Sequence, residues 1–287
     1  MKKKLILLLC TCIIMLSGCN LNEDFSDKYI YTTFYPIEYA TQTLYEKESK
    51  IASVYPDNAT TSYEVTDKKK KIYSTGEIFV YSGIANEAYL ARDLLNANSN
   101  LKLIDATKGM DNNLSITNIW LDPSNYLMLC SNIKSSLIDY NNNVYTKEKI
   151  EENYKKLNEE VSEIDVKLYD IGKNGNYNTI LTTSDVFNYL TKYNINVISI
   201  NKNNESIDKA YAEATKLIKA KDIEYIYVLE NEELTEEQEK FISSNSLTKV
   251  TINDMYTLSD EERKEEKDYI ILMDEIIDNY KKELYKN

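Results

Sequence analysis

Residues 146–172 read TKEKIEENYKKLNEEVSEIDVKLYDIG and hold the longest regular apolar pattern of the chain. Its apolar and aromatic residues recur at steps of three or four positions: Ile150, Tyr154, Leu157, Val161, Ile164, Leu168 and Ile171. This spacing puts them in one stripe along an α-helix of about six turns. Thr146 is the expected N-cap, and Gly172 and Gly175 are expected to end the helix. A coiled coil and a rigid helix between two lobes both fit, and the shortness of the stripe favours the second.

Strand-like and helix-like segments alternate on both sides of this stretch. Before it, strands are expected at 29–34, 78–81 and 101–105, with helices at 37–47, 85–95 and 124–138. After it, strands are expected at 179–182, 196–200, 224–229 and 249–252, and helices around 186–193, 206–219, 235–243 and 259–284. The predicted fold is therefore α/β: two lobes, each a mostly parallel sheet flanked by helices, joined by one long rigid helix. A ligand is expected in the crevice between the lobes.

The first nineteen residues have the pattern of an exported lipoprotein. Three lysines (residues 2–4) precede an apolar run (residues 5–16), and Ser17-Gly18-Cys19 follows. The run is too short for a permanent membrane span and resembles a secretory signal. We expect cleavage before Cys19, lipidation of its thiol, and anchoring to the bacterial cell membrane outside the cytoplasm. An ordinary cleaved signal that happens to contain a cysteine is the alternative.

These features divide the chain into five predicted segments. They are a signal peptide (1–18), a lipidated polar tether (19–28), an N-terminal α/β lobe (29–145), the connecting helix (146–172) and a C-terminal α/β lobe (173–287).

Composition excludes several classes of function. The 287-residue chain has a net charge of −13 and no basic stripe that would follow phosphates, so nucleic acid is not an expected partner. It has no histidine, which removes the Ser–His and Cys–His pairs of nucleophilic enzymes. Cys130 is the only cysteine within the predicted lobes and is expected to be a buried hydrophobic residue. We expect a monomer that is not an enzyme, forms no internal disulfide and requires no cofactor.

Six short strings follow one another along the chain in an informative order. They are Tyr31–Pro36, Val80–Gly83 with Glu87, Ile104–Gly109, Trp120–Pro123, Thr182–Leu190 and Leu258–Leu284. In this order they resemble the solute-binding lipoproteins of bacterial zinc- and manganese-type ABC importers, and Trp120–Pro123 (WLDP) is the most distinctive string. The resemblance covers nearly the whole mature chain. It implies the two-lobe fold, a role in metal-ion uptake and an ABC permease as partner.

The resemblance also shows where this chain departs from the family. Members of that family usually hold the metal with three histidines and a late carboxylate. Alignment on the strings places Thr61, Asn118 and Ser184 at the histidine positions and Asp254 at the carboxylate position. Only Asp254 matches a family ligand, and neutral oxygens bind borderline metals weakly. The resemblance therefore implies a degenerate site at which a divalent metal binds weakly or not at all.

Two functions remain open at this level. One is the lipid-anchored, extracytoplasmic solute-binding component of an ABC importer. The other is a non-transport surface lipoprotein, an adhesin or interaction protein, that keeps the scaffold without binding metal. An oxygen-rich site for a calcium- or magnesium-like ion would need carboxylates from Asp122, Asp185, Glu230 and Asp254. Asp122 and Asp185 are better explained as helix-capping and first-turn charges.

Overall fold

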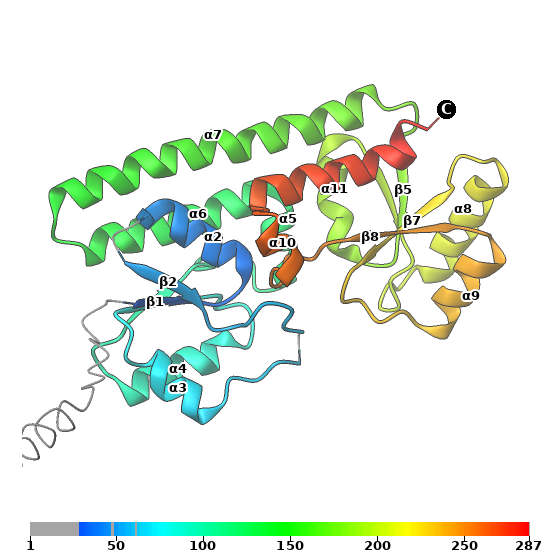
Figure 1. The fold of residues 1–287 in the computed structure, drawn as a ribbon. Helices are drawn as coiled ribbons and strands as arrows, with labels where there is room; N and C mark the ends of the chain where they lie inside the picture. The colour runs from blue at the N-terminus through cyan, green and yellow to red at the C-terminus, as the bar shows by residue number, and fades with distance from the viewer. Residues whose placement is uncertain (1–28, 47–48, 61, 287) are drawn as a thin grey trace, which may run out of the picture.

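This computed structural model describes residues 29–46, 49–60 and 62–286. Two parallel four-stranded sheets form its two lobes (Figure 1). The first sheet has the order β2-β1-β3-β4 and consists of β1 (Tyr29–Thr32), β2 (Lys50–Ser53), β3 (Ile78–Tyr81) and β4 (Lys102–Asp105). The second has the order β6-β5-β7-β8 and consists of β5 (Thr179–Thr182), β6 (Asn196–Ser199), β7 (Tyr225–Leu229) and β8 (Thr248–Ile252). All strand pairs are parallel, which confirms the predicted α/β fold class.

Helices cover both sheets. Those before the long helix are α2 (Tyr35–Tyr45), α3 (Asp67–Tyr73), α4 (Glu87–Ala97), α5 (Ile116–Leu121) and α6 (Pro123–Tyr140). Those after it are the 3₁₀ helix η2 (Asp185–Tyr193), α8 (Ile207–Lys219), α9 (Glu236–Ser244), α10 (Asp260–Lys264) and α11 (Tyr269–Leu284). In Figure 1, α3 and α4 lie on one side of the first sheet and α2 and α6 on the other. No helix among these described segments is both long and apolar enough to cross a membrane.

The long helix α7 (Val144–Asn174) has 31 residues, or about 46 Å, and runs along both lobes in Figure 1. Its predicted apolar stripe is confirmed, because six of the seven residues are at most 2% exposed and Tyr154 packs partly buried against the core. The stripe packs against α2, α6 and α11. One continuous helix therefore supports both sheets.

The start of α7 and the role of Gly172 differ from the prediction, whereas the end at Gly175 agrees with it. The N-cap is Asn143, whose Oδ1 accepts hydrogen bonds from the backbone N–H of Tyr145 (2.9 Å) and Thr146 (3.4 Å). Thr146 is already inside the first turn and buried, so its expected role as N-cap was wrong. Gly172 does not end the helix; a Cβ on it would lie 1.9 Å from the carbonyl oxygen of Tyr193. This glycine allows α7 to approach η2 closely, and Gly175 is the C-cap.

Two further segments correct the sequence prediction. The single helix expected at 259–284 is two helices, because Glu266 adopts a left-handed conformation (φ 54°) and Asp268 caps a new helix through the N–H of Ile271 (2.8 Å). The strand β2 was not predicted; its sequence KIAS has little strand character, and it lies at the edge of the first sheet.

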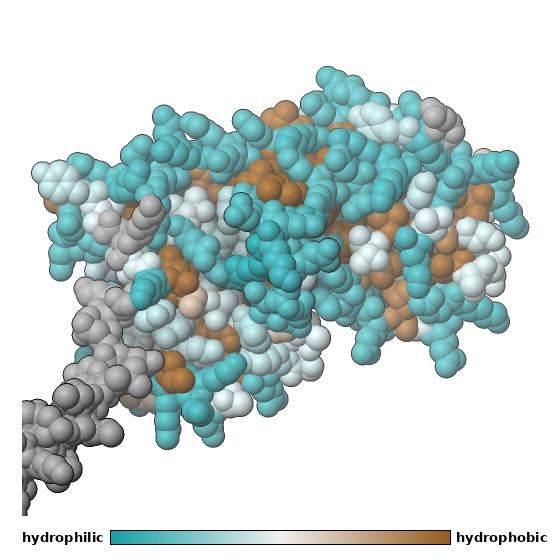
Figure 2. All heavy atoms as spheres, in the orientation of Figure 1, coloured by the Kyte–Doolittle hydropathy of each residue, from teal (hydrophilic) through white to brown (hydrophobic). Residues whose placement is uncertain are grey.

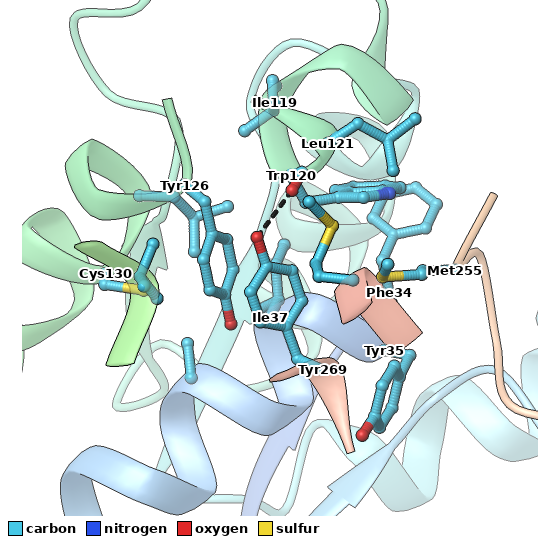
Figure 3. Packing of buried hydrophobic residues seen from close by; sticks show 14 of the residues in the cluster. Phe34, Tyr35, Ile37, Ile119, Trp120, Leu121, Tyr126, Cys130, Met255 and Tyr269 are labelled. Atoms are coloured by element: carbon cyan, nitrogen blue, oxygen red, sulfur yellow. Dashed lines mark hydrogen bonds between the residues drawn. The ribbon is translucent and has the colours of Figure 1, made fainter. Parts of the chain in front are cut away.

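One hydrophobic core passes from the first lobe into the second. Figure 3 shows its centre, where Phe34, Trp120, Tyr126 and Tyr269 meet. The Tyr269 hydroxyl donates to the Trp120 carbonyl oxygen, and the Trp120 indole N–H donates to the Asp254 carbonyl oxygen, both over 2.7 Å. The same core includes Phe187 and Tyr227 of the second lobe, while a smaller cluster lies beneath α8 and α9. The lobes are thus joined by shared packing as well as by α7.

Cys130 lies within this core and is fully buried, as predicted. Burial raises the pKa of its thiol far above the ordinary value, so the reactive thiolate is disfavoured. On the surface, hydrophilic residues cover most of the face drawn in Figure 2, and hydrophobic residues appear there in small groups.

Candidate functional site

Asn118 and Ser184 lie together at the junction of the two lobes. Asn118 is on α5, Ser184 directly precedes η2, and both line one pocket of about 400 Å³. Asp254, in the loop after β8, lines a separate hollow of about 170 Å³. Thr61 lies outside the described residues. The structure therefore brings two of the four predicted site residues into one pocket and places Asp254 in another.

The side chains of Asn118 and Ser184 both make hydrogen bonds to η2. The Asn118 amide nitrogen donates to the carbonyl oxygen of Val186 (3.0 Å), and its Oδ1 accepts a long bond from the Asn125 amide (3.4 Å). The Ser184 Oγ accepts from the backbone N–H of Val186 (3.3 Å) and so caps η2. These two positions hold the lobes together and begin a helix.

Asp254 is 7% exposed, and both of its carboxylate oxygens have donors. Oδ2 accepts from the Asn231 amide and Oδ1 from the backbone N–H of Tyr256, both over 2.9 Å. Glu230 and Glu262 line the same hollow. Burial raises the pKa of Glu230, and the nearby charges of Asp254 and Glu262 raise it further. The hollow is acidic, and its most buried carboxylate stabilises the loop around it.

The four carboxylates considered for an oxygen-rich site are not gathered at one place. Asp122 caps α6 through the N–H of Ser124 (2.9 Å) and pairs with Lys192. Asp185 lies in the first turn of η2 and accepts from the Asn201 amide (2.9 Å). The structural roles predicted for these two residues are confirmed. Across residues 29–46, 49–60 and 62–286, no three cysteine or acidic side chains are grouped so that they could hold a metal ion.

Beside the Asp254 loop lies a buried group that sequence reasoning missed. The rings of Tyr55 and Tyr256 stack at 5.5 Å, and the Tyr55 hydroxyl donates to Glu87 Oε1 over 2.6 Å. Glu87 is 5% exposed, and its Oε2 has no hydrogen-bond partner within the described part of the chain. Burial raises the pKa of Glu87 and that of Tyr256, the latter to about 12. Glu87 stood out in the sequence only as part of a family string, because the residues that contact it are remote along the chain.

Comparisons with known proteins agree with this fold. The model of a family described as "Zinc-uptake complex component A periplasmic" matches residues 30–283. No curated protein matches the chain.

Solved structures with the same architecture include three metal-related proteins. The zinc-bound ZnuA-like domain of AdcA from Streptococcus pneumoniae has 22% identity and a TM-score of 0.70, over 91% of this chain and 100% of that one. The metal-dependent lipoprotein YcdH from Bacillus subtilis has 20% identity and a TM-score of 0.73, over 90% and 100%. A manganese-bound mutant of a periplasmic metal binding protein from Candidatus Liberibacter asiaticus has 14% identity and a TM-score of 0.71, over 90% and 100%. At these identities the similarity concerns the fold alone.

Proposed function

The chain belongs to the family of periplasmic zinc-uptake complex component A, and from this membership we propose that it is the extracytoplasmic, lipid-anchored solute-binding component of an ABC importer. The family is one of solute-binding proteins rather than enzymes. The lack of histidine supports a non-enzymatic role here, because the commonest general base is missing. Lipidation of Cys19, the signal at 1–18 and the tether at 19–28 are part of the proposal, as are lobes at 29–145 and 173–287.

The proposal includes a family metal position that binds zinc weakly or not at all. The observation that carries this part is the pairing of both Asp254 oxygens with Asn231 and Tyr256. These two donors already stabilise the carboxylate charge, so a metal ion at Asp254 would gain less there than at an unpaired carboxylate. Asn118 and Ser184 supply only neutral oxygens and already bond to η2. Zinc prefers nitrogen and sulfur ligands in tetrahedral sites, which this set does not provide.

The metal part is tested by titrating the chelator-treated full chain with zinc, manganese and calcium in a calorimeter. We expect no dissociation constant tighter than the micromolar range. The variant Asp254→Asn removes the charge and keeps one of the two accepting oxygens, and it should leave the weak binding nearly unchanged. Nanomolar zinc binding that Asp254→Asn abolishes would overturn this part of the proposal.

The importer part is tested in cells that make the full chain. We expect palmitate to label the protein, Cys19→Ser to release it from the membrane, and chemical cross-linking to join it to an ABC permease. A control variant, Cys130→Ser, keeps Cys19 and should remain labelled. A labelled, membrane-bound protein that cross-links to no permease would instead favour the surface lipoprotein that does not transport.

A further inference from the structure

The pocket of about 400 Å³ at Asn118 is built by both lobes and is almost free of charged groups. Asn113, Ser115 and Asn118 come from the first lobe, and Ser184, Asp185 and Asn188 from the second. Its volume lies within the range of about 300–1,000 Å³ that is usual for small-molecule sites. The pocket is therefore large enough for a solute of several heavy atoms rather than a single ion.

The charges around this pocket argue against an ionic ligand. Among the described residues that line it, Asp185 is the only charged side chain, and its Oδ2 already accepts from Asn201. No lysine or arginine in the described lining can pair with an anion, and the chain's net charge of −13 adds repulsion. A calcium- or magnesium-like ion needs several oxygen ligands, with more than one carboxylate for tight binding. A neutral ligand fits this lining best.

Several polar atoms of the pocket keep unused hydrogen-bonding capacity. The oxygens of Ser115 and Ser184 accept from backbone N–H groups at 3.2 and 3.3 Å, which leaves each hydroxyl hydrogen free to donate. The exposed amide of Asn188 makes no side-chain hydrogen bond within the described chain, and Asp185 Oδ1 likewise has no donor there. Donors and acceptors thus occur side by side, and a ligand hydroxyl, which both donates and accepts, can use both.

Apolar groups complete the lining. Leu114 and Val186 are partly buried at the pocket and present methyl groups next to these polar atoms. A polyhydroxylated solute has the matching character, because its carbon atoms carry both C–H and O–H groups. The bond between the Asn118 amide and Val186 also fixes the two walls relative to each other, so the pocket is formed before a ligand arrives.

We propose that this pocket binds a small neutral polyhydroxylated solute, a polyol or monosaccharide, through the hydroxyls of Ser115 and Ser184, the amide of Asn188 and the carboxylate of Asp185. The inference rests on the proposed function as a solute-binding component. It assigns that component a solute of a different class from a metal ion.

The test uses the purified full chain and a panel of glycerol, inositol, ribose, glucose, galactose and mannose. Binding is measured by thermal unfolding and by saturation-transfer NMR. A true ligand at a hundredfold its dissociation constant should raise Tm by about 4–5 °C. Asn188→Ala and Asp185→Asn should each weaken binding of that solute at least tenfold. Asn188 is exposed and lacks side-chain hydrogen bonds in the described structure, so its loss should not disturb folding.

The matched control is Asn96→Ala, an exposed asparagine on α4 away from the pocket, which should bind the solute like the wild type. The inference is overturned if no neutral solute binds, or if one binds equally well to the pocket variants. If the protein binds only a metal ion or a charged solute, the proposed class of neutral polyhydroxylated ligands is overturned, while the importer proposal stands. Failure to cross-link to a permease, with sugar binding intact, overturns the importer proposal alone.

Discussion

Tyr269 contributes to the junction of the lobes through its buried ring and through one hydroxyl group. That hydroxyl donates to the carbonyl oxygen of Trp120 at 2.7 Å, and both residues are fully buried (Figure 3). Tyr269→Phe keeps the ring and leaves this carbonyl without its donor. We expect a loss of about 1–3 kcal/mol in the free energy of unfolding, measured by urea denaturation.

Tyr145→Phe is the control for this substitution. Tyr145 is 82% exposed, so removing its hydroxyl should change the free energy of unfolding by less than about 0.5 kcal/mol. Equal effects of the two substitutions would show that the Tyr269 bond does not stabilise the fold.

Glu87 should make stability depend on pH. Burial raises the pKa of its carboxyl in the folded state above the unfolded value of about 4.3. Below that value the carboxyl is protonated in both states; as pH rises, the unfolded chain ionises first and is favoured. The wild type should therefore lose stability relative to Glu87→Gln as pH rises from about 4 through the raised folded pKa. Urea denaturation at several pH values measures this difference.

Glu64→Gln is the control for the pH series, because Glu64 is exposed. Its difference from the wild type should stay nearly constant over the same range. A flat difference for Glu87→Gln as well would mean that Glu87 is ionised as easily in the fold as in the unfolded chain.

The sequence proposed positions for the candidate site but could not say how their side chains are used. The order of strings along the chain led to Asn118, Ser184 and Asp254, of which the structure brings the first two into one pocket. Their hydrogen bonds join residues as far apart as 118 and 186, and no local pattern encodes such contacts. The hydrogen bond between Tyr55 and Glu87 could not be predicted either, because these residues are also remote along the chain.

Among the elements, α7 offers a test in which helix propensity and packing disagree. Alanine favours an interior helix position over glycine by about 1 kcal/mol. At Gly172, however, the added Cβ would lie 1.9 Å from the Tyr193 carbonyl oxygen, so α7 and η2 would have to separate. We expect Gly172→Ala to destabilise the protein by about 1–3 kcal/mol in thermal or urea unfolding.

Asp170→Ala, on the exposed side of the same turn, is the control and should change stability by less than about 0.5 kcal/mol. A stabilising Gly172→Ala would mean that the contact between α7 and η2 adjusts at little cost.

Periodicity predicted the elements whose faces are buried and was least accurate at their ends. The stripe of α7 and seven of the eight strands followed from apolar spacing. The ends of these helices depend on capping residues. The α7 helix begins after Asn143 rather than at Thr146, and Asp268 caps a new helix where one continuous helix was expected. The strand β2 is recognised only through its pairing with β1, which is a tertiary contact.

At the scale of the whole molecule, the shared core predicts that the lobes unfold together. Trp120 is the only tryptophan of the chain and lies at the junction, so its fluorescence reports on that point. Far-UV circular dichroism reports on the helices of both lobes. We expect the two signals to change in one coincident urea transition. Two separate midpoints would mean that the lobes are independent folding units.

The shared core limits how far the two lobes can move relative to each other. Because the lobes share one core and one 31-residue helix, a large closure of one lobe on the other would break contacts in that core. If the chain binds a solute as proposed, we expect the change on binding to be local and to fall on η2, since 3₁₀ hydrogen bonds have poorer geometry than those of an α-helix. In the proposed importer, the permease would then recognise a small change in surface shape around residues 185–193.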